Sequence, residues 1–228
     1  MLMETNKKFK AVIFDLDGTL LDSLESIAMG ANAVLEELGF SPCGLEEYRS
    51  FVGKGAKELI RQALYAAGDT ELKNFEKALE IHKSAYKKYA LYKIKKYDGI
   101  AEVIEKLKKA GIIVAVNSNK PEARAIGVLD TMFGENTFDI IVGQVEERRR
   151  KPYPDGCLLI ADKFGFAPKE CMYVGDTDID MKTGKAAQMY TVGAVWGFRT
   201  REELEACGAD IAIDTPYEIL KLTNIQVD

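Results

Sequence analysis

A short apolar run that ends in two acids constrains the fold of this chain more than any other feature. Residues 11–14 (AVIF) are continuously apolar, and residues 15–19 (DLDGT) follow directly. A continuous run with β-branched residues predicts a strand that is covered on both faces. Ligands of open α/β sheets bind beyond the carboxyl ends of such strands. Asp15 and Asp17 are therefore candidate site residues, although a plain turn through Gly18 would also fit.

From Tyr97 onward, helical and strand patterns alternate. Strands are expected at 112–116, 138–142, 171–174, 190–192 and 210–213, and helices at 99–110, 121–132, 154–165, 178–187 and 202–207, with a closing helix. Such alternation predicts right-handed βαβ crossovers and a parallel sheet. The expected fold class is therefore α/β, with a Rossmann-like parallel sheet as its core.

The stretch between the first strand and this alternation has a helical pattern without a clear strand. Helices are expected from Ser23 to Gly39 and at 45–52, 55–67 and 70–91, with glycines at several of the breaks. Asp22 followed by Glu25 resembles a capping box for the first of them.

This organisation predicts two domains. Residues 1–20 and 96–228 are expected to form the catalytic core, and residues 21–95 an all-helical cap domain inserted after the first strand. The cap is expected to hang over the carboxyl edge of the sheet, with hinges near 18–22 and 93–98.

Composition excludes several classes of function. The chain has 228 residues, of which 47% are hydrophobic, enough to bury a core. It shows neither a secretory signal nor a stretch near the ~18 apolar residues of a membrane span. The 4 cysteines have no CxxC spacing, and the net charge of −5 disfavours nucleic-acid binding. We expect a cytoplasmic monomer or homodimer that binds neither nucleic acid nor membrane.

Polar residues follow other strands of the expected sheet as well. Residues 112–116 lead into Ser118 and Asn119, and residues 171–174 lead into Asp176 and Asp180. Lys151 lies between these segments, before a proline. The strand-end rule would gather all of these side chains near Asp15 and Asp17.

Such a set is suited to phosphoryl transfer. Asp15, Asp17 and Asp176 in one pocket would repel one another, and a divalent cation with oxygen ligands, most naturally Mg²⁺, would relieve the repulsion. Lys151 would add a positive charge for phosphoryl oxygens, and Ser118 a hydroxyl donor.

Each feature also has a structural explanation. Ser118 and Asn119 could cap the next helix, and Lys151 could be an exposed loop residue. Asp176 and Asp180 stand four residues apart and could cap a helix as well.

The order and spacing of the motifs resemble those of the haloacid dehalogenase superfamily phosphatases across nearly the whole chain. DxDGT at 15–19, Ser118-Asn119, Lys151-Pro152 and GDxxxD at 175–180 match the four motifs of that family. The helical insertion is similar to the family's small α-helical cap. FVGKG at 51–55 and VWG at 195–197 resemble phosphoglycolate-phosphatase-type members.

The resemblance implies roles for the core residues. Asp15 would be the nucleophile that forms an aspartyl-phosphate, and Asp17 the general acid and then the general base. Mg²⁺ would be held by the Asp15 carboxylate, the Asp17 main-chain carbonyl and Asp176. Asp180 would orient Lys151 or a metal-bound water.

Ser118, Asn119 and Lys151 would bind the phosphate. Arg49 and Lys54, beside a Gly-x-Gly break in the cap, could reach the leaving group, although solvent exposure fits equally well. His82, the single histidine, is predicted to lie on the surface, because nothing near it supplies a relay partner.

We therefore expect a Mg²⁺-dependent phosphomonoester hydrolase for a small metabolite such as 2-phosphoglycolate. A phosphosugar mutase resembling β-phosphoglucomutase is the alternative within the superfamily, and Thr19 favours the hydrolase. A non-catalytic relative is a third possibility, disfavoured because Asp15, Asp17 and Lys151 are all present.

Overall fold

The computed structural model describes residues 9–226, and its chain forms two compact units. One unit runs to Leu21 and resumes at Lys96, and the other is Asp22–Lys95. At the junction, β2 (Leu21–Asp22) pairs with β3 (Lys95–Lys96) in a two-stranded sheet. These strands were not predicted, because two residues are too few to show a period.

The first unit is built on a six-stranded sheet in the order β5-β4-β1-β6-β7-β8. Its strands are β1 (Ala11–Phe14), β4 (Ile113–Pro121), β5 (Ile140–Gln144), β6 (Cys171–Gly175), β7 (Tyr190–Ala194) and β8 (Ile211–Ile213). All neighbouring strands are parallel, and every residue of β1 is buried. The predicted α/β class and parallel sheet are confirmed.

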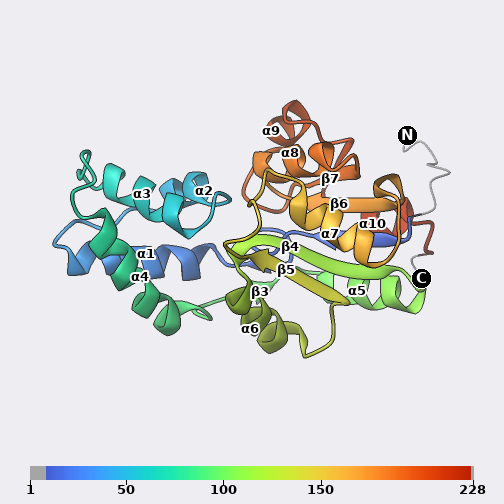
Figure 1. Ribbon diagram of the computed structural model, residues 1–228, viewed down its shortest axis with the longest axis horizontal. Helices are drawn as coiled ribbons and strands as arrows, with labels where there is room; N and C mark the ends of the chain where they lie inside the picture. The colour runs from blue at the N-terminus through green and yellow to red at the C-terminus, as the bar shows by residue number, and fades with distance from the viewer. Residues whose placement is uncertain (1–8, 227–228) are drawn as a thin grey trace. The chain divides into compact units, whose positions relative to one another are not determined.

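Helices cover both faces of this sheet. They are α5 (Ile100–Lys109), α6 (Glu122–Phe133), α7 (Asp155–Lys163), α8 (Asp178–Ala186), α9 (Arg201–Ala206) and α10 (Tyr217–Leu222), with a 3₁₀ helix, η1 (Pro168–Glu170). In Figure 1, α5 and α6 lie on one side of the sheet, and α8 and α9 on the other. The strand order reverses next to β1, and such a switch point forms a crevice for ligands at the carboxyl edge.

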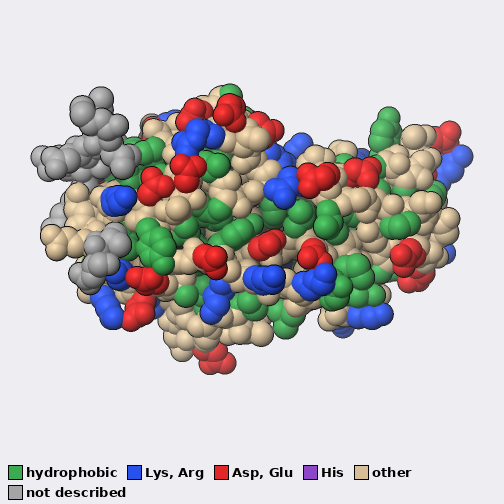
Figure 2. Space-filling model, turned by 180° about the vertical axis from the view of Figure 1, so that it is seen from behind, with side chains coloured by type: hydrophobic (Ala, Val, Ile, Leu, Met, Phe, Trp, Pro, Cys, Tyr) green, Lys and Arg blue, Asp and Glu red, His purple; other side chains and the backbone are tan. Residues whose placement is uncertain are grey.

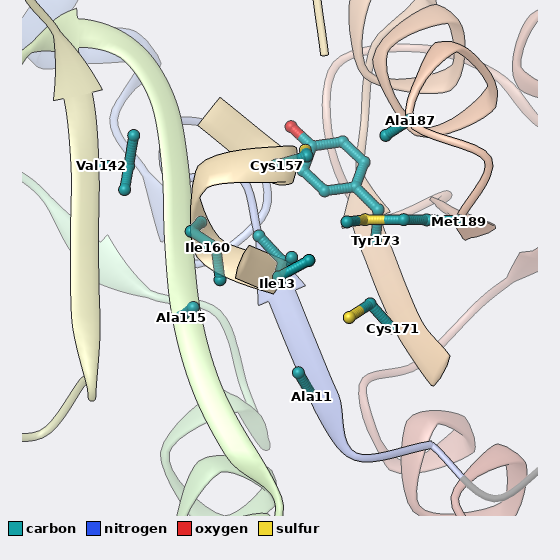
Figure 3. Close-up of a cluster of buried hydrophobic side chains, with 11 residues drawn as sticks. Ala11, Ile13, Ala115, Val142, Cys157, Ile160, Cys171, Tyr173, Ala187 and Met189 are labelled. Atoms are coloured by element: carbon teal, nitrogen blue, oxygen red, sulfur yellow. The ribbon is translucent and has the colours of Figure 1, made fainter. Parts of the chain in front are cut away.

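One apolar layer of this unit leads directly to that edge. Ala11 and Ile13 of β1 pack with Tyr173 of β6 and Ile160 of α7 (Figure 3). Alternate residues of a strand share a face. Asp15 therefore continues the row of Ala11 and Ile13, at the carboxyl edge where this apolar layer ends.

The second unit is a helical bundle. It contains α1 (Leu24–Glu37), α2 (Leu45–Phe51), α3 (Ala56–Ala66) and α4 (Phe75–Tyr89). The predicted surface position of His82 is wrong, because His82 is only 7% exposed. It lies on the buried face of α4 with Ala78, Ile81 and Ala85, at helical spacing.

Local side-chain contacts shift two of the expected helix starts. The capping box expected at Asp22 does not form, because Asp22 ends β2 and Glu25 pairs with Lys93 at 2.6 Å. Helix α4 begins at Phe75 rather than near 70. The Asp69 carboxylate accepts hydrogen bonds from main-chain N–H groups of residues 73 and 74, which folds this segment into a turn.

The surface carries charges of both signs. Figure 2 shows acidic and basic side chains interspersed on one face. Some oppositely charged side chains are helix neighbours, such as Lys109 with Glu105 and Lys182 with Asp178. Within residues 9–226, no helix has the length and hydropathy that a membrane span requires.

Candidate active site

Strand β1 delivers Asp15 to the carboxyl edge of the sheet. The Asp15 N–H donates to the carbonyl of Val174 at 2.9 Å, so the pairing with β6 continues one residue beyond the strand. The chain then turns at Gly18, which has a φ of 90°. A Cβ at Gly18 would collide with the carboxylate of Asp176. Glycine is therefore required both by the backbone conformation and by the closeness of the two acidic segments.

Lys151 links two of the predicted acids. Its Nζ lies 2.7 Å from Oδ1 of Asp15 and 2.7 Å from Oδ1 of Asp180. All three side chains are buried. Lys151 is therefore not an exposed loop residue, and its charge is shared between the end of β1 and the first turn of α8.

Asn119 fixes the backbone of Lys151. Its Oδ1 accepts from the Lys151 N–H at 2.9 Å, and its Nδ2 donates to the Lys151 carbonyl at 3.2 Å. The sequence suggested a phosphate ligand at Asn119, and that role stays a prediction. The observed contact is with the loop that carries Lys151.

Asp176 is held by groups from two distant segments. Its Oδ1 accepts from the Thr19 hydroxyl at 2.8 Å, and its Oδ2 accepts from the Phe198 N–H at 2.9 Å. Trp196 Nε1 in turn donates to the Thr19 carbonyl at 3.1 Å. Sequence reasoning did not foresee that Thr19 and the loop after β7 orient this carboxylate.

Asp180 both caps α8 and binds Lys151. Its Oδ2 accepts from the N–H of Thr177 at 3.0 Å and from the hydroxyl of Thr177 at 2.6 Å, which completes a capping box. Its Oδ1 accepts from Lys151 Nζ and, at 3.0 Å, from the Tyr173 hydroxyl. The capping and the orienting explanations are therefore compatible, and both oxygens of Asp180 are engaged by the protein.

Ser118 lies within an extended strand rather than at a helix cap. Strand β4 continues to Pro121, so the motif belongs to the sheet, and the next helix is preceded by Pro121. Ser118 is buried, and its Oγ accepts from the Lys120 N–H at 3.2 Å.

Lys120 is a site residue to which the sequence assigned no role. Its Nζ donates to both carboxylate oxygens of Asp17, at 2.7 and 2.6 Å. The lysine side chain is 8% exposed and that of Asp17 19%. Because Lys120 follows a polar motif on a strand next to β1, the strand-end rule could have singled it out.

Burial dominates the electrostatics of this cluster. It raises the pKa of Asp15 from 3.8 to about 7, with a further contribution from the charge of Asp180 and an opposing one from Lys151. Burial and the charges of Asp180 and Asp15 likewise raise the pKa of Asp176 well above its usual range. Burial alone would lower the pKa of Lys151, but the two acids beside it raise it. The protein's own cations thus offset the negative charge only in part.

The donor set fits a hard divalent cation. Carboxylate oxygens of Asp15, Asp176 and Asp180 lie within 4.8 Å of one another. Within residues 9–226, the buried Asp15 Oδ1 has the Lys151 ammonium, at 2.7 Å, as its polar partner and accepts from no second donor. Each oxygen of Asp180 accepts two hydrogen bonds, one of them from the Lys151 ammonium, whereas each oxygen of Asp176 accepts one from a neutral donor. Asp15 and Asp176 are therefore the better placed ligands. The role expected for the Asp17 carbonyl stays a prediction.

Arg49 and Lys54 belong to the helical unit. Arg49 lies in α2, where its side chain is 41% exposed and 3.5 Å from Glu46. Lys54 is exposed in the turn before α3. A contact of either residue with the leaving group stays a prediction.

Known proteins resemble this chain over almost its full length. Residues 12–194 match the family model of haloacid dehalogenase-like hydrolases. The chain is 34% identical to a phosphoglycolate phosphatase of Pseudomonas putida over 209 residues, covering 90% of this chain and 76% of the relative. It is 32% identical to a phosphoglycolate phosphatase of Aquifex aeolicus over 213 residues, covering 93% and 96%.

A solved structure agrees with these sequence matches. The crystal structure of a predicted phosphoglycolate phosphatase from Haemophilus somnus 129pt superposes with a TM-score of 0.89 at 27% identity, covering 96% of this chain and 100% of that one. The order of the motifs and the buried acidic cluster agree with this relationship. The chain therefore belongs to the haloacid dehalogenase-like hydrolase family and is a phosphatase.

Proposed function

We propose that this phosphatase is a Mg²⁺-dependent phosphomonoester hydrolase that works through an aspartyl-phosphate on Asp15. The observation that carries the proposal is the buried pairing of Asp15 with Lys151, at 2.7 Å, beside a second buried acid, Asp176. A nucleophilic carboxylate needs a nearby positive charge that can also attract the dianionic phosphoryl group. Lys151 supplies that charge at the point where β1 ends.

In the first step, an oxygen of Asp15 attacks the phosphorus of the ester. A bond forms between Asp15 and phosphorus, and the bond from phosphorus to the ester oxygen breaks. Asp17, two residues further on, gives its proton to that oxygen, and the alcohol leaves. Lys151 and the hydroxyl of Ser118 stabilise the charge on the phosphoryl oxygens.

In the second step, water attacks the phosphorus of the aspartyl-phosphate. Asp17 takes the proton of the water, and the bond between phosphorus and Asp15 breaks. Inorganic phosphate is released, and Asp15 and Asp17 return to their starting states. Asn119 contributes by fixing the backbone of Lys151 through both steps.

The Asp15 and Asp176 carboxylates, together with the Asp17 carbonyl, would hold Mg²⁺. The ion would supply positive charge at the phosphoryl oxygens and reduce the repulsion between the two acids. Thr19 and the Phe198 N–H keep Asp176 oriented for this purpose.

The proposed substrate is a small phosphorylated metabolite, with 2-phosphoglycolate as the leading candidate. The support comes from the relatives named phosphoglycolate phosphatase, which cover this chain almost completely. The physical features of the site select for a phosphoryl group, and the relatives' names supply the identity of the alcohol.

A direct assay tests this proposal. Purified protein should release inorganic phosphate from 2-phosphoglycolate with Mg²⁺, and excess chelator should abolish the release. Ca²⁺ should inhibit, because it accepts more oxygen ligands than Mg²⁺ and could draw both oxygens of Asp15 away from attack. Full activity in excess chelator would contradict the metal requirement, and transfer of the phosphate to a sugar hydroxyl instead of water would indicate a mutase.

A further inference from the structure

Lys120 presents a nearly buried positive charge to the residue proposed to protonate the leaving group. Its ammonium donates to both oxygens of Asp17 at 2.7 and 2.6 Å, across 103 positions of sequence. Its side chain is 8% exposed. This pair differs from an ordinary surface ion pair, in which both side chains are commonly exposed.

The Lys120 ammonium lies close to the place where the leaving group would bind. In the proposed mechanism, the ester oxygen lies within hydrogen-bond reach of Asp17. Lys120 contacts the same Asp17 carboxylate, so its ammonium lies near the position of the ester oxygen. In an α-phosphooxy carboxylate, a single carbon separates the ester oxygen from the carboxylate group. A substrate carboxylate of this kind can therefore reach Lys120 while the ester oxygen faces Asp17.

A lysine in this site can hold two carboxylates at once. Lys151 does so, with Asp15 and Asp180 each at 2.7 Å. An ammonium has three donors, which permits such sharing. Lys120 could likewise hold Asp17 together with a carboxylate of the substrate. The substrate carboxylate would also draw the ammonium partly away from Asp17. This would free an Asp17 oxygen to face the ester oxygen, as proton transfer requires.

We propose that Lys120 recognises the carboxylate of the leaving group, so that the sheet-bearing unit itself selects α-phosphooxy carboxylates over neutral phosphate esters. This inference rests on the proposed function, because it uses Asp17 as the proton donor to the leaving group. It assigns part of the substrate selectivity to the end of β4, separately from any contribution of the helical unit.

The test compares two esters of nearly equal shape, 2-phosphoglycolate and its neutral carboxamide, 2-phosphoglycolamide. The wild type should prefer the carboxylate. Lys120→Met should lower kcat/KM for 2-phosphoglycolate about 10- to 100-fold more than for the carboxamide, because a hydrogen-bonded charge is lost only with the former. Lys120→Arg should keep most of the preference. Lys106→Met, which removes a lysine paired with Glu102 on α5, should leave both rates intact.

The outcomes separate this inference from the proposed function. Equal losses on both esters, or a wild type that does not prefer the carboxylate, would overturn the inference while leaving the phosphatase activity in place. A wild type that hydrolyses neither ester nor p-nitrophenyl phosphate with Mg²⁺ would contradict the proposed function itself. If Lys120→Met does not fold, Lys120→Gln, which keeps a donor for Asp17 without the charge, gives the same comparison.

Discussion

The carboxyl edge of the sheet and the helical unit use charged residues in opposite ways. At the edge of the sheet, the side chains of Lys151 and Asp180 are 3% and 0% exposed. In the helical unit, those of Lys73 and Glu71 are 75% and 72% exposed. Exposed pairs contribute roughly 0–1 kcal/mol to stability, whereas buried charges are costly to desolvate. Stability therefore does not explain why the buried charges of Lys151 and Asp180 are present, whereas a role in the reaction would. The exposed pair of Lys73 and Glu71 contributes little to stability and has no proposed role in the reaction.

A second contrast lies in two asparagines that make the same pair of backbone contacts. Asn119 binds the N–H and carbonyl of Lys151, and Asn32 of the helical unit binds the N–H and carbonyl of Cys43 at 2.9 and 3.0 Å. The hydrogen bonds are alike, but only one of the loops carries a site residue. Comparing the two asparagines therefore tests whether the contact with Lys151 matters for the reaction as well as for stability.

The largest expected effect comes from Asp15→Asn. Without the nucleophile, phosphatase activity should fall by at least about 1,000-fold, because the covalent route is lost. Asp178→Asn is the matched control, since Asp178 pairs with Lys182 at the surface and should be dispensable. Steady-state rates with circular dichroism decide the matter. A well-folded Asp15→Asn variant that keeps more than a few per cent of activity would show that the buried cluster is not the reaction centre.

The asparagine pair gives the next largest difference. Asn119→Ala should lower kcat about 10- to 100-fold, because the Lys151 backbone loses two hydrogen bonds and its ammonium is then positioned less firmly between Asp15 and Asp180. Both variants should lower the free energy of unfolding by a similar amount, roughly 1–3 kcal/mol, but Asn32→Ala should leave kcat almost unchanged. Kinetics and thermal unfolding of both variants test this contrast. Similar kcat values for the two would refute a positioning role for Asn119.

The thermal stability of the protein should depend on pH through the buried carboxyl of Asp15. Burial raises the pKa of Asp15 to about 7 in the folded protein, against 3.8 ordinarily. Such a carboxyl stabilises the fold below about pH 4, and that stability is lost as the pH rises through 7. In chelator at pH 8, Asp15→Asn should therefore unfold about 5 °C above the wild type, and the gap should narrow toward pH 4.

Calorimetric scans from pH 4 to 8 measure this gap. Mg²⁺ should reduce it at pH 8 by stabilising the wild type, because a ligand that binds only the folded state raises its stability. A gap independent of pH would mean that the charge of Asp15 is well compensated without metal.

The smallest expected effect concerns the exposed charges of the helical unit. If Arg49 and Lys54 contact the leaving group, alanine at either position should lower kcat/KM for 2-phosphoglycolate by about tenfold, and that for p-nitrophenyl phosphate much less. Equal losses on both substrates would place these residues in phosphoryl binding or folding. No loss on either would return the selectivity to Lys120 and the sheet-bearing unit.

The sequence predicted the elements of the sheet because strand ends carry recognisable patterns. The apolar run of β1, followed by Asp15, predicted the edge at which Asp15, Lys151 and Asp176 lie close together, since parallel strands share one carboxyl edge. The same reasoning could not give side-chain partners. The contacts of Lys120 with Asp17 and of Thr19 with Asp176 depend on how strands distant in sequence align in space.

The helical unit was predictable as helices and little more. Periodicity located α1 to α4, but the burial of His82 was missed because a polar residue on an apolar face leaves no distinct pattern. The turn at Asp69 was missed as well, because it depends on side-chain hydrogen bonds to the backbone. Helical patterns specify packing faces, and they do not specify which ligand a helix contacts.

The most direct test of the account is to capture the phosphate on Asp15. Asp17→Asn lacks the base for the second step, while p-nitrophenyl phosphate has a leaving group that departs without an acid. Rapid mixing of this variant with the labelled ester and Mg²⁺ should release one equivalent of p-nitrophenol in a burst. Peptide mapping after acid quench should then find the phosphate on Asp15. A phosphate found on Ser118 or another residue, or turnover without a burst and without label on the protein, would contradict the account.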